Sequence, residues 1–446
     1  MEAPIHPGLP LLGSILDLQR DALETFTRAS KLGDVVEIKV PWFRAFLINH
    51  PDLIERVLHD NYKAYGKQTR GYAALRTILG NGLLTSEGSF WLRQRRLAQP
   101  AFHKENLASW GATMVKATRE LADAWLQRAR TAEAFDVHDD MMRLTLRVVG
   151  QALMSTDLTG AASEIGDALT HLLRLLTART SRIISLPDWV PTPAQRRLES
   201  ERARLDRVVH DLIAERRATK PGDDLLGMLM SATDSDTGER MNDAQLRDEV
   251  MTILLAGHET TANALSWAFV LLAQHPGVEE QLRAELQSVL GGREPTAADM
   301  PKLQYTSAVL HEALRLYPPV WALARSASED DVIGGVAIPK GSLVFFMPFI
   351  VHRRGDVWPD AERFDPSRWL PGGHRPKSRC AFMPFSSGPR KCIGDGFALL
   401  EGTLVLATLL QRVKLGLVPG QRIEAEPVFT LRPREGVKVV ARAVAN

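Results

Sequence analysis

A short segment near the C-terminus, residues 385–394, constrains the fold and chemistry of this chain more than any other. It reads Phe-Ser-Ser-Gly-Pro-Arg-Lys-Cys-Ile-Gly, so Cys392 follows two cations and precedes an apolar run that favours a helix. Positive side chains and the N-terminus of a helix both lower the pKa of a thiol. Gly388 and Gly394 allow a tight turn and a close approach to a large flat group. The segment predicts a thiolate at the start of a helix, although most lone cysteines are inert and buried.

The pattern F-x-x-G-x-R-x-C-x-G resembles the cysteine loop of the cytochrome P450 family. The resemblance implies haem b (iron protoporphyrin IX) as the cofactor, with the Cys392 thiolate as the axial ligand of its iron and with Phe385 and Gly394 beside it. It also implies the family's fold, which is mainly α with small β-sheets (α+β). In that fold a triangular prism of helices holds the haem between a long central helix and the helix that follows Cys392.

Composition argues against several other classes of protein. The chain has 446 residues, a net charge of +2 and two cysteines, so neither a nucleic-acid-binding footprint nor a disulfide framework is expected. The segment Met1 to Leu16 is rich in Pro and Gly, and its apolar stretch is too short for a signal peptide. No run approaches the roughly 18 apolar residues of a membrane-spanning helix. We therefore expect a cytoplasmic monomer without a membrane anchor.

We expect a single domain over residues 1–446, because no credible linker divides the chain. The expected β-rich part comprises about 1–70, 320–350 and 425–446, and the expected helix-rich, haem-binding part comprises about 71–320 and 351–424.

Three elements of this organisation can be placed more closely. A long helix is predicted from Asn242 to Leu271, with Gln245 completing a capping box at its start. A Pro- and Gly-rich loop over 359–389 is longer than compact domains usually tolerate, which suggests that it has a function. A closing pair of strands is expected near 428–442.

The predicted long helix carries an unusual polar segment, Ala-Gly-His-Glu-Thr-Thr at residues 256–261. A glycine in a helix interior costs about 1 kcal/mol relative to alanine. The segment resembles the oxygen-binding groove of the P450 family, which implies that Ala256 and Gly257 make room for dioxygen. The same resemblance implies that Glu259 brings protons in and that Thr260 donates them locally. A packing glycine beside solvated polar residues is the alternative, and the zinc motif H-E-x-x-H is incomplete because residue 262 is alanine.

Glu312 and Arg315 lie three residues apart in a predicted helix, where a solvated surface pair would be an ordinary finding. In the P450 family such a pair precedes the cysteine loop and binds a second arginine from a segment of the form F-x-P-x-R-[FW]. Residues 364–369, Phe-Asp-Pro-Ser-Arg-Trp, match that form with Arg368 and depart from it mildly at Ser367. The resemblance implies a structural triad of Glu312, Arg315 and Arg368 that fixes the loop carrying the cysteine.

The two carboxylates of haem need polar or cationic partners when they leave water. The resemblance implies that four residues supply them, namely Trp91, Arg95, Arg325 and Arg390. Arginine suits this role because its planar fork pairs with a carboxylate through two hydrogen bonds. His352 is a weaker fifth candidate, and an ordinary loop histidine is the alternative. Arg93 and Arg96 are expected to face solvent or a partner, and Cys380 is expected to be a packed or idle thiol.

The substrate pocket can be inferred only from the family's arrangement. It implies pocket-lining segments at 72–84, 172–189, 320–323 and 428–431, together with the long helix. The residues singled out are Ile78, Leu84, Met251, Leu255, Val320, Leu323 and Phe429. Because they are apolar and supply no charged anchor, they favour a hydrophobic substrate such as a fatty acid, terpenoid or steroid-like molecule. Core packing would explain the same residues almost as well.

Electrons are expected to come from a separate protein. No flavin or iron–sulfur segment follows the closing strands, and Gly394-Asp395-Gly396 lacks the third glycine of a dinucleotide fingerprint. Four cations lie on the cysteine side of the chain: Arg375, Lys377, Arg379 and Lys391. We expect this basic face to dock an acidic ferredoxin or flavodoxin that an NAD(P)H-dependent reductase supplies with electrons.

Together these motifs predict a haem-thiolate monooxygenase that inserts one oxygen atom of O2 into a hydrophobic substrate, by hydroxylation or epoxidation. The Pro-Gly-Leu-Pro start at 7–10 and the segment 256–261 resemble the fatty-acid-hydroxylase and microsomal branch of the family. Two alternatives stay open. One is a related enzyme that uses peroxide or rearranges a hydroperoxide, against which Glu259 and Thr260 argue. The other is a non-catalytic haem- or lipid-binding protein, since apolar pockets also serve storage.

Overall fold

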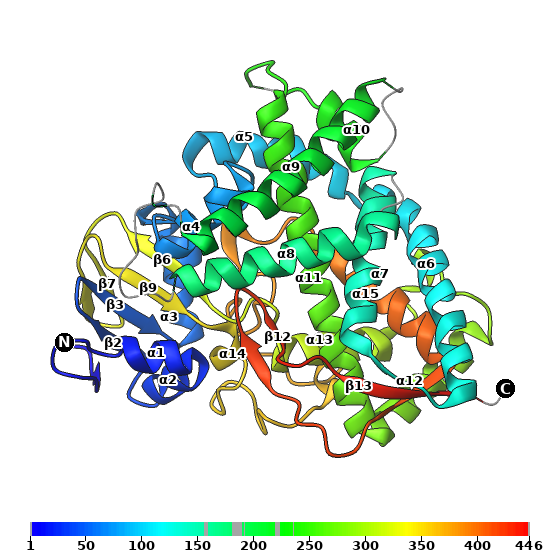
Figure 1. The fold of residues 1–446 in the computed structure, drawn as a ribbon. Coiled ribbons are helices and arrows are strands. Elements are labelled where there is room, and N and C mark those ends of the chain that lie inside the picture. The colour runs from blue at the N-terminus through cyan, green and yellow to red at the C-terminus, as the bar shows by residue number, and fades with distance from the viewer. Residues whose placement is uncertain are drawn as a thin grey trace.

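Helices form most of the structure, a computed structural model that describes residues 2–155, 159–180, 190, 192–218, 224–234 and 236–444 (Figure 1). The helices, in chain order, are α1 (Ile15–Arg20), α2 (Ala22–Ser30), α3 (Pro51–Glu55), α4 (Arg70–Leu79), α5 (Gly88–Ala98), α6 (Lys104–Thr131), α7 (Val137–Val148), α8 (Thr159–Thr180), α9 (Pro193–Ala218), α10 (Leu225–Ser231), α11 (Asp243–Gln274), α12 (Pro276–Leu290), α13 (Gln304–Leu316), α14 (Pro348–Val351) and α15 (Asp395–Leu410).

The strands form small sheets beside this helical body. They are β1 (Ile5–His6), β2 (Val35–Val40), β3 (Phe43–Ile48), β4 (Tyr65–Gly66), β5 (Ala134–Asp136), β6 (Leu323–Ala327), β7 (Asp331–Ile333), β8 (Val336–Ile338), β9 (Leu343–Phe346), β10 (Val413–Leu417), β11 (Ala425–Pro427), β12 (Leu431–Pro433) and β13 (Lys438–Ala443). The largest sheet has the order β1-β2-β3-β9-β6-β4, so that N-terminal strands lie beside strands of the 323–346 region. The predicted fold class, mainly α with small β-sheets, is confirmed.

The helix α11 runs through the middle of the helical body (Figure 1). Its predicted capping box is confirmed, because the Gln245 amide donates to the Asn242 side chain and the Asn242 amide donates to the Gln245 side chain, each at 2.9 Å. From Val250 to Leu272 most of its residues are buried. The helix packs against α7, α13 and α15, so one helix connects the cysteine helix to the opposite side of the molecule.

The closing strands differ from the predicted pair. The strands β12 and β13 do not pair with one another: β12 pairs with β11, and β13 pairs with β10 and β5. The chain turns between them at Gly436, which has a φ of 72° and approaches the Asp136 carboxylate so closely that a Cβ would overlap it. This turn and Pro433 separate the two strands, and β12 then packs against α11.

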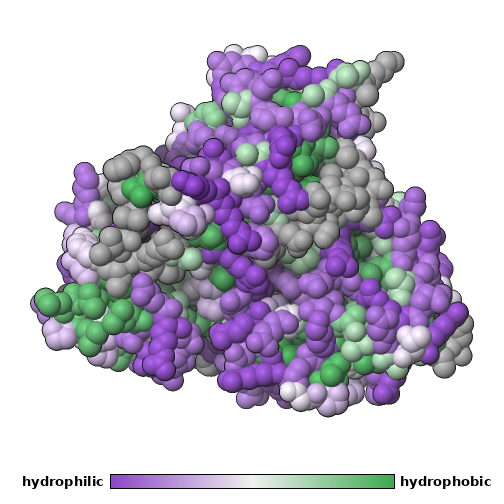
Figure 2. All heavy atoms as spheres, in the orientation of Figure 1, coloured by the Kyte–Doolittle hydropathy of each residue, from purple (hydrophilic) through white to green (hydrophobic). Residues whose placement is uncertain are grey.

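The long loop between α14 and α15 contains only short turns of 3₁₀-helix, at Pro366–Trp369 and Gly388–Arg390. It packs against α13 through the first of these turns. Of the helices in the described ranges, none combines the length and the apolar character needed to cross a membrane. Figure 2 shows one face of the molecule as mostly hydrophilic, with an apolar patch near the N-terminal end, where Ile5, Leu9 and Leu11 are exposed.

Candidate active site

The backbone of the loop before α15 presents Cys392 at the start of that helix. The Cys392 amide donates to the Phe385 carbonyl at 2.9 Å, which closes the turn. Gly388 has a φ of 74°, and a Cβ at this residue would lie 2.0 Å from the Leu58 carbonyl oxygen. Only glycine permits this approach. The thiol is accessible and lies just before Gly394, the N-cap of α15.

Without a metal, the surroundings of Cys392 raise the pKa of its thiol, whereas the predicted thiolate belongs to the form in which the sulfur binds iron. The residue is exposed on its open side, yet the protein atoms on the other sides desolvate the sulfur enough to raise the pKa of the thiol. The Gly394 amide, Arg95 and Lys391 act in the opposite direction, but they do not outweigh burial. A metal ion bonded to the sulfur reverses this balance, because a coordinating thiol is deprotonated outright.

Arg325 and Arg390 approach the same region from different elements. Arg325, from β6, is buried and donates to the Tyr72 hydroxyl at 3.2 Å. Arg390, from the cysteine loop, stacks on the Trp91 ring with its guanidinium carbon 3.8 Å from the ring centre. It also donates to the Ser86 carbonyl at 2.8 Å. Both arginines therefore have neutral partners.

Two further cations complete this cluster. Arg95, one turn after Trp91 on α5, donates to the Lys391 carbonyl at 2.8 Å. Lys67, which sequence reasoning missed, is buried and donates to the Leu84 carbonyl at 2.5 Å. We call Lys67, Arg95, Arg325 and Arg390 the cation cluster. Lys67 carries no motif, so only the folded chain reveals it.

The cation cluster fits the two carboxylates of haem. Within the described part of the chain, none of its four members has an ion-pair partner. Burial lowers the pKa of Lys67 well below its usual value, and the charges of Arg325 and Arg390 lower it further. Burial, with Arg325 next in effect, lowers the pKa of Arg390 to about 10. Unpaired cations that destabilise one another in a buried region indicate a site for negative charge.

His352 does not belong to this cluster, contrary to its place as a fifth candidate. Its ring is fully buried, with Nδ1 3.1 Å from the Arg315 carbonyl oxygen and Nε2 accepting the Met383 amide at 2.9 Å. Burial lowers its pKa to about 3, so the ring is neutral and cannot balance a carboxylate. Its position holds the long loop against α13 instead.

Arg93 and Arg96 are partly exposed, and both form ion pairs within the chain that the sequence did not reveal. Arg93 pairs with Glu239, and Arg96 donates to the Asp234 carboxylate at 2.9 Å and pairs with Asp236 at 2.7 Å. The acids belong to a turn before α11 that is distant in sequence, so the spacing on α5 could not reveal them. The other free cysteine, Cys380, is buried as predicted, and burial raises its pKa to about 12.

On α11 the polar segment presents two different sides. Ala256 is exposed although it lies in the middle of a buried helix, and the Thr260 hydroxyl beside it donates to the Ala256 carbonyl at 2.6 Å. Gly257 faces Val149 rather than this open space, since a Cβ at Gly257 would lie 3.1 Å from a Val149 methyl carbon. The structure thus supports a packing role for Gly257, while Ala256 and Thr260 border open space.

Glu259 lies on a buried side of the helix and accepts the Thr430 hydroxyl at 2.7 Å. Thr430 in turn accepts the Asn263 side-chain amide at 3.1 Å. Burial raises the pKa of Glu259, although the Thr430 hydrogen bond, Arg432 and Arg174 lower it. A buried carboxyl group of raised pKa, with a hydroxyl partner, holds a proton more readily than a solvated carboxyl group does. Sequence reasoning missed Thr430, which comes from the segment before β12.

The structure brings Glu312, Arg315 and Arg368 together without solvent. Glu312 and Arg315 are fully buried, and Arg315 donates to both Glu312 carboxylate oxygens, at 2.8 and 2.7 Å. Arg368 donates to Glu312 at 3.3 Å, and so does the Trp369 indole at 2.9 Å. Arg315 also donates to the His352 carbonyl at 2.7 Å, which ties α13 to the start of the long loop.

The predicted substrate residues separate into two groups. Ile78 and Met251 are 1% and 0% exposed, so they belong to the closed core rather than to a pocket wall, which corrects the prediction. The partly accessible ones are Leu84, Val320, Leu323 and Phe429, with Leu255 8% exposed. The predicted segment 172–189 lies partly outside the described residues, since 181–189 are not among them.

Glu249 links α11 to the loop before α5 and leads to a testable pH dependence. Its carboxylate accepts the Leu83 amide at 3.0 Å and the Gln94 side-chain amide at 3.1 Å. Burial raises its pKa from the ordinary 4.5 to about 7. The folded protein therefore binds this proton more tightly than the unfolded chain does, and the free energy of unfolding falls as the pH rises through this interval.

We expect Glu249→Gln to flatten this pH dependence and to raise the free energy of unfolding at about pH 8 by about 1–3 kcal/mol. The glutamine keeps an acceptor oxygen and carries no charge. Urea unfolding followed by circular dichroism across the pH range measures the effect. The control is Glu133→Gln, at an exposed position near the end of α6. Equal pH slopes in Glu249→Gln and the unmodified protein would contradict the assignment.

The predicted basic face is exposed but partly neutralised. Lys391 pairs with Asp395 at 2.5 Å, and Arg379 pairs with Glu55 at 2.5 Å. Lys377 and Arg375 are exposed as well. The face therefore has less net positive charge than the spacing of its cations suggested.

Comparison with known proteins agrees with this geometry. The sequence model of the family described as Cytochrome P450 matches residues 4–440. Cyclooctatin synthase from Streptomyces melanosporofaciens is 39% identical over 427 residues, which cover 95% of this chain and 92% of that protein. Cyclooctat-9-en-7-ol 5-monooxygenase from the same organism is 38% identical, with coverage of 93% and 90%. Pentalenene oxygenase from Streptomyces avermitilis is 36% identical, with coverage of 96% and 92%.

A haem-dependent oxidoreductase is the class of protein that the fold and the site define. The chain belongs to the cytochrome P450 family, whose members bind haem b through a cysteine thiolate. It is a monooxygenase of that family, as its relatives are. The alternative of a non-catalytic carrier is thereby set aside.

Proposed function

We propose that this monooxygenase hydroxylates a terpenoid substrate at an unactivated carbon. The observation that carries the proposal is the accessible Cys392 thiol beside a cation cluster without carboxylate partners. The substrate class is supported by the apolar side chains that remain accessible, such as Leu84 and Phe429. It is supported also by the names of two relatives, which act on cyclooctat-9-en-7-ol and pentalenene.

The residues of this chain have separate roles in holding the cofactor. The Cys392 sulfur would bind the iron, and the cation cluster would bind the two carboxylates of the haem. Phe385 and Gly394 leave room beside the sulfur, and Trp91 supports Arg390 by stacking. When bound, haem supplies the iron at which dioxygen is activated.

Proton delivery is the role that we assign to Glu259 and Thr260. The Thr260 hydroxyl donates its hydrogen bond to the Ala256 carbonyl, so its oxygen lone pairs are free to accept one from a water molecule on the open side of the helix. Glu259 precedes Thr260 on the helix, and we assign it the supply of protons to such water because its raised pKa suits that role.

Thr260→Ala is expected to uncouple electron consumption from product formation. Without the Thr260 hydroxyl, a water molecule on the open side of the helix loses a hydrogen-bond partner. Protons are then no longer delivered to the correct oxygen atom of dioxygen. We expect product per NAD(P)H consumed to fall by at least about tenfold while hydrogen peroxide rises, with an unchanged spectrum of the reduced, carbon-monoxide-bound form.

The matched control is Thr261→Ala, which removes a neighbouring hydroxyl that is buried rather than open to the site. It should leave the coupling of electrons to product near that of the unmodified protein. Tight coupling in Thr260→Ala would remove Thr260 from proton delivery.

We propose further that the electrons come from a separate acidic ferredoxin or flavodoxin, which docks on the basic face around Lys377. The proposed docking surface is supported by the exposure of its four cations, which are Arg375, Lys377, Arg379 and Lys391. The rate of reduction should fall as salt is raised from about 0.02 to 0.5 M, because the Debye length shortens. A rate independent of ionic strength would argue for a docking surface without charge.

Incubation with terpenoid hydrocarbons and alcohols under labelled dioxygen tests the proposed reaction. We expect one labelled oxygen atom in the product, dependent on NAD(P)H and on the electron donor. If turnover requires only added peroxide and carries no label from dioxygen, the peroxide-using alternative replaces the proposal. Conversion of fatty acids but not of terpenoids would refute the substrate class alone.

A further inference from the structure

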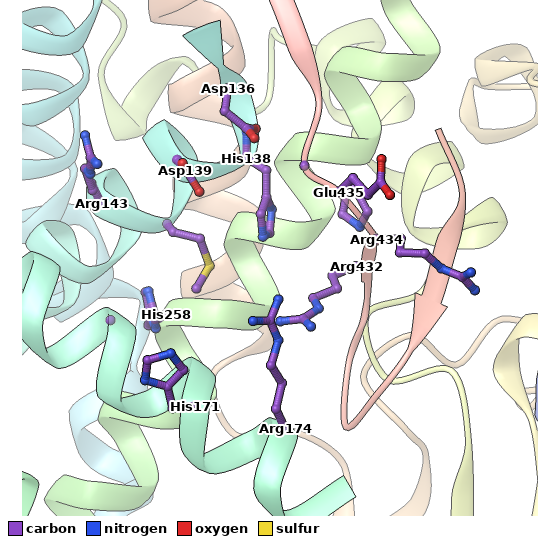
Figure 3. Close-up of a pocket in the computed structure, with 14 residues that line it drawn as sticks. Asp136, His138, Asp139, Arg143, His171, Arg174, His258, Arg432, Arg434 and Glu435 are labelled. Carbon is purple, nitrogen blue, oxygen red and sulfur yellow. The ribbon is translucent and has the colours of Figure 1, made fainter. Parts of the chain in front are cut away.

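A polar cavity of about 360 Å3 lies beside α11, between that helix, α7, α8 and the segment from β12 to the turn at Gly436 (Figure 3). His258 faces it from α11. Because His258 follows Ala256 by about 200° around the helix, the cavity lies on the side of α11 away from the candidate active site. We call it the histidine–arginine cavity, after His138, His171, His258, Arg174 and Arg432 in its wall.

His258 is buried here without a hydrogen-bond partner. It is 0% exposed, and within the described chain neither of its ring nitrogens has a partner of normal geometry. The Met142 carbonyl is close enough to favour a proton on the ring, yet burial outweighs it and lowers the pKa of His258 to about 4. At this pKa the ring is neutral at neutral pH, so the positive charge of the cavity wall comes from its arginines.

Two guanidinium groups meet in the middle of the cavity. Figure 3 shows Arg174 reaching from α8 towards Arg432. Within the described ranges Arg174 has no ion-pair partner, whereas Arg432 donates from Nε and one terminal nitrogen to the Glu426 carboxylate, at 2.8 and 2.6 Å. The other terminal nitrogen of Arg432 has no such bond. Like charges this close repel unless an anion lies between them.

The acids of the cavity wall are engaged elsewhere. The Asp136 carboxylate accepts the Val437 and His138 amides, each at 2.9 Å, and lies 3.4 Å from the Lys438 ammonium. Glu435 points away from the two arginines in Figure 3, and Asp139 lies near His138 at the far side. Glu259, behind the wall, offsets part of the positive charge but does not line the cavity.

We propose that the histidine–arginine cavity binds a small oxyanion of the phosphate or diphosphate class, with Arg174 and Arg432 as its charge partners. Arginine forks match phosphate oxygens through paired hydrogen bonds. The cavity has room for a diphosphate together with a short organic group or water. The proposal is independent of the reaction assigned above, since it concerns binding on the other side of α11.

Isothermal titration calorimetry on the haem-loaded protein with inorganic diphosphate tests the proposal, at constant ionic strength maintained with chloride. We expect one saturable site, and at least about tenfold weaker binding in Arg174→Ala, because a charge-assisted hydrogen bond is lost. Arg174 is exposed, so this variant should fold. The matched control is Arg130→Ala, since Arg130 is also exposed and is not among the residues that line the cavity.

Each result of these titrations either supports or contradicts the proposed oxyanion site. Absence of saturable binding up to about 10 mM diphosphate overturns the proposal, and so does an equal loss of affinity in both arginine variants. Titrations with inorganic phosphate and with an alkyl diphosphate identify the source of the anion. Tighter binding of the alkyl diphosphate supports an organic phosphate ester as the occupant, and equal binding supports a free inorganic anion. None of these readouts depends on turnover.

Discussion

Cys392→Ala is expected to abolish the strongly red-shifted absorption band of the reduced, carbon-monoxide-bound protein, together with all monooxygenase activity. The band requires that a cysteine thiolate bind the haem iron, and Cys392 would supply it. The other cysteine cannot take this place, since Cys380 is buried in a different cluster of side chains. The cation cluster, which we propose to bind the haem carboxylates, is unchanged, so some haem should still bind without the thiolate signature.

The control for this variant is Cys380→Ala, which removes a packed thiol of similar size. It should keep the red-shifted band and lose only about 1–2 kcal/mol of stability by creating a small cavity. A Cys392→Ala protein that retains the band would show that another ligand holds the iron, and the assignment of Cys392 would be withdrawn.

Glu312→Ala is expected to prevent stable folding, because it leaves the buried charge of Arg315 without its carboxylate. Both side chains are 0% exposed, and Glu312 accepts hydrogen bonds from two arginines, an indole and the Asp365 amide at 3.0 Å. Removing one member of such a buried pair costs about 3–5 kcal/mol. That loss is a large part of the about 5–15 kcal/mol that stabilises an ordinary protein.

We expect the variant to show low soluble yield and a urea midpoint far below that of the unmodified protein, followed by circular dichroism and haem absorbance. Glu362→Ala is the matched control, because its side chain is 76% exposed and pairs with Arg353 at 3.2 Å. It should change stability by less than about 1 kcal/mol. If Glu312→Ala changes it equally little, the triad does not hold the long loop.

The same measurement bears on the proposal that residues 1–446 form one domain. Arg325 in β6 bonds Tyr72 in α4, and Trp267 in α11 donates to the Leu431 carbonyl at 3.1 Å. Such contacts join the β-rich and helix-rich parts. We therefore propose that circular dichroism and haem absorbance change in a single transition, whereas two separated transitions would indicate two units.

The sequence alone was most informative about features that depend on residues adjacent in the chain. The turn at Gly388, the capping box of α11 and the position of Cys392 before α15 each depend on a few adjacent residues, because caps and tight turns are local. The order of motifs was enough to predict the family and its mixed α+β fold, which the structure and the relatives confirm.

Residues that act through distant partners were predicted poorly. The acids that bind Arg93 and Arg96 come from another part of the chain. Lys67 and Thr430 have no motif around them, and their importance comes from what surrounds them after folding. Ile78 and Met251 look like pocket residues in sequence, yet packing closes around them.

The thiol of Cys392 shows this division most clearly. Its neighbours along the chain are cations and the start of a helix, which favour a thiolate. These features can be identified from the sequence. Burial works against them and is the larger effect in the folded protein. The sequence by itself determined which groups the site would contain. Only the tertiary structure decided their charge and their partners, because desolvation and Coulomb interactions depend on every atom that folding brings near.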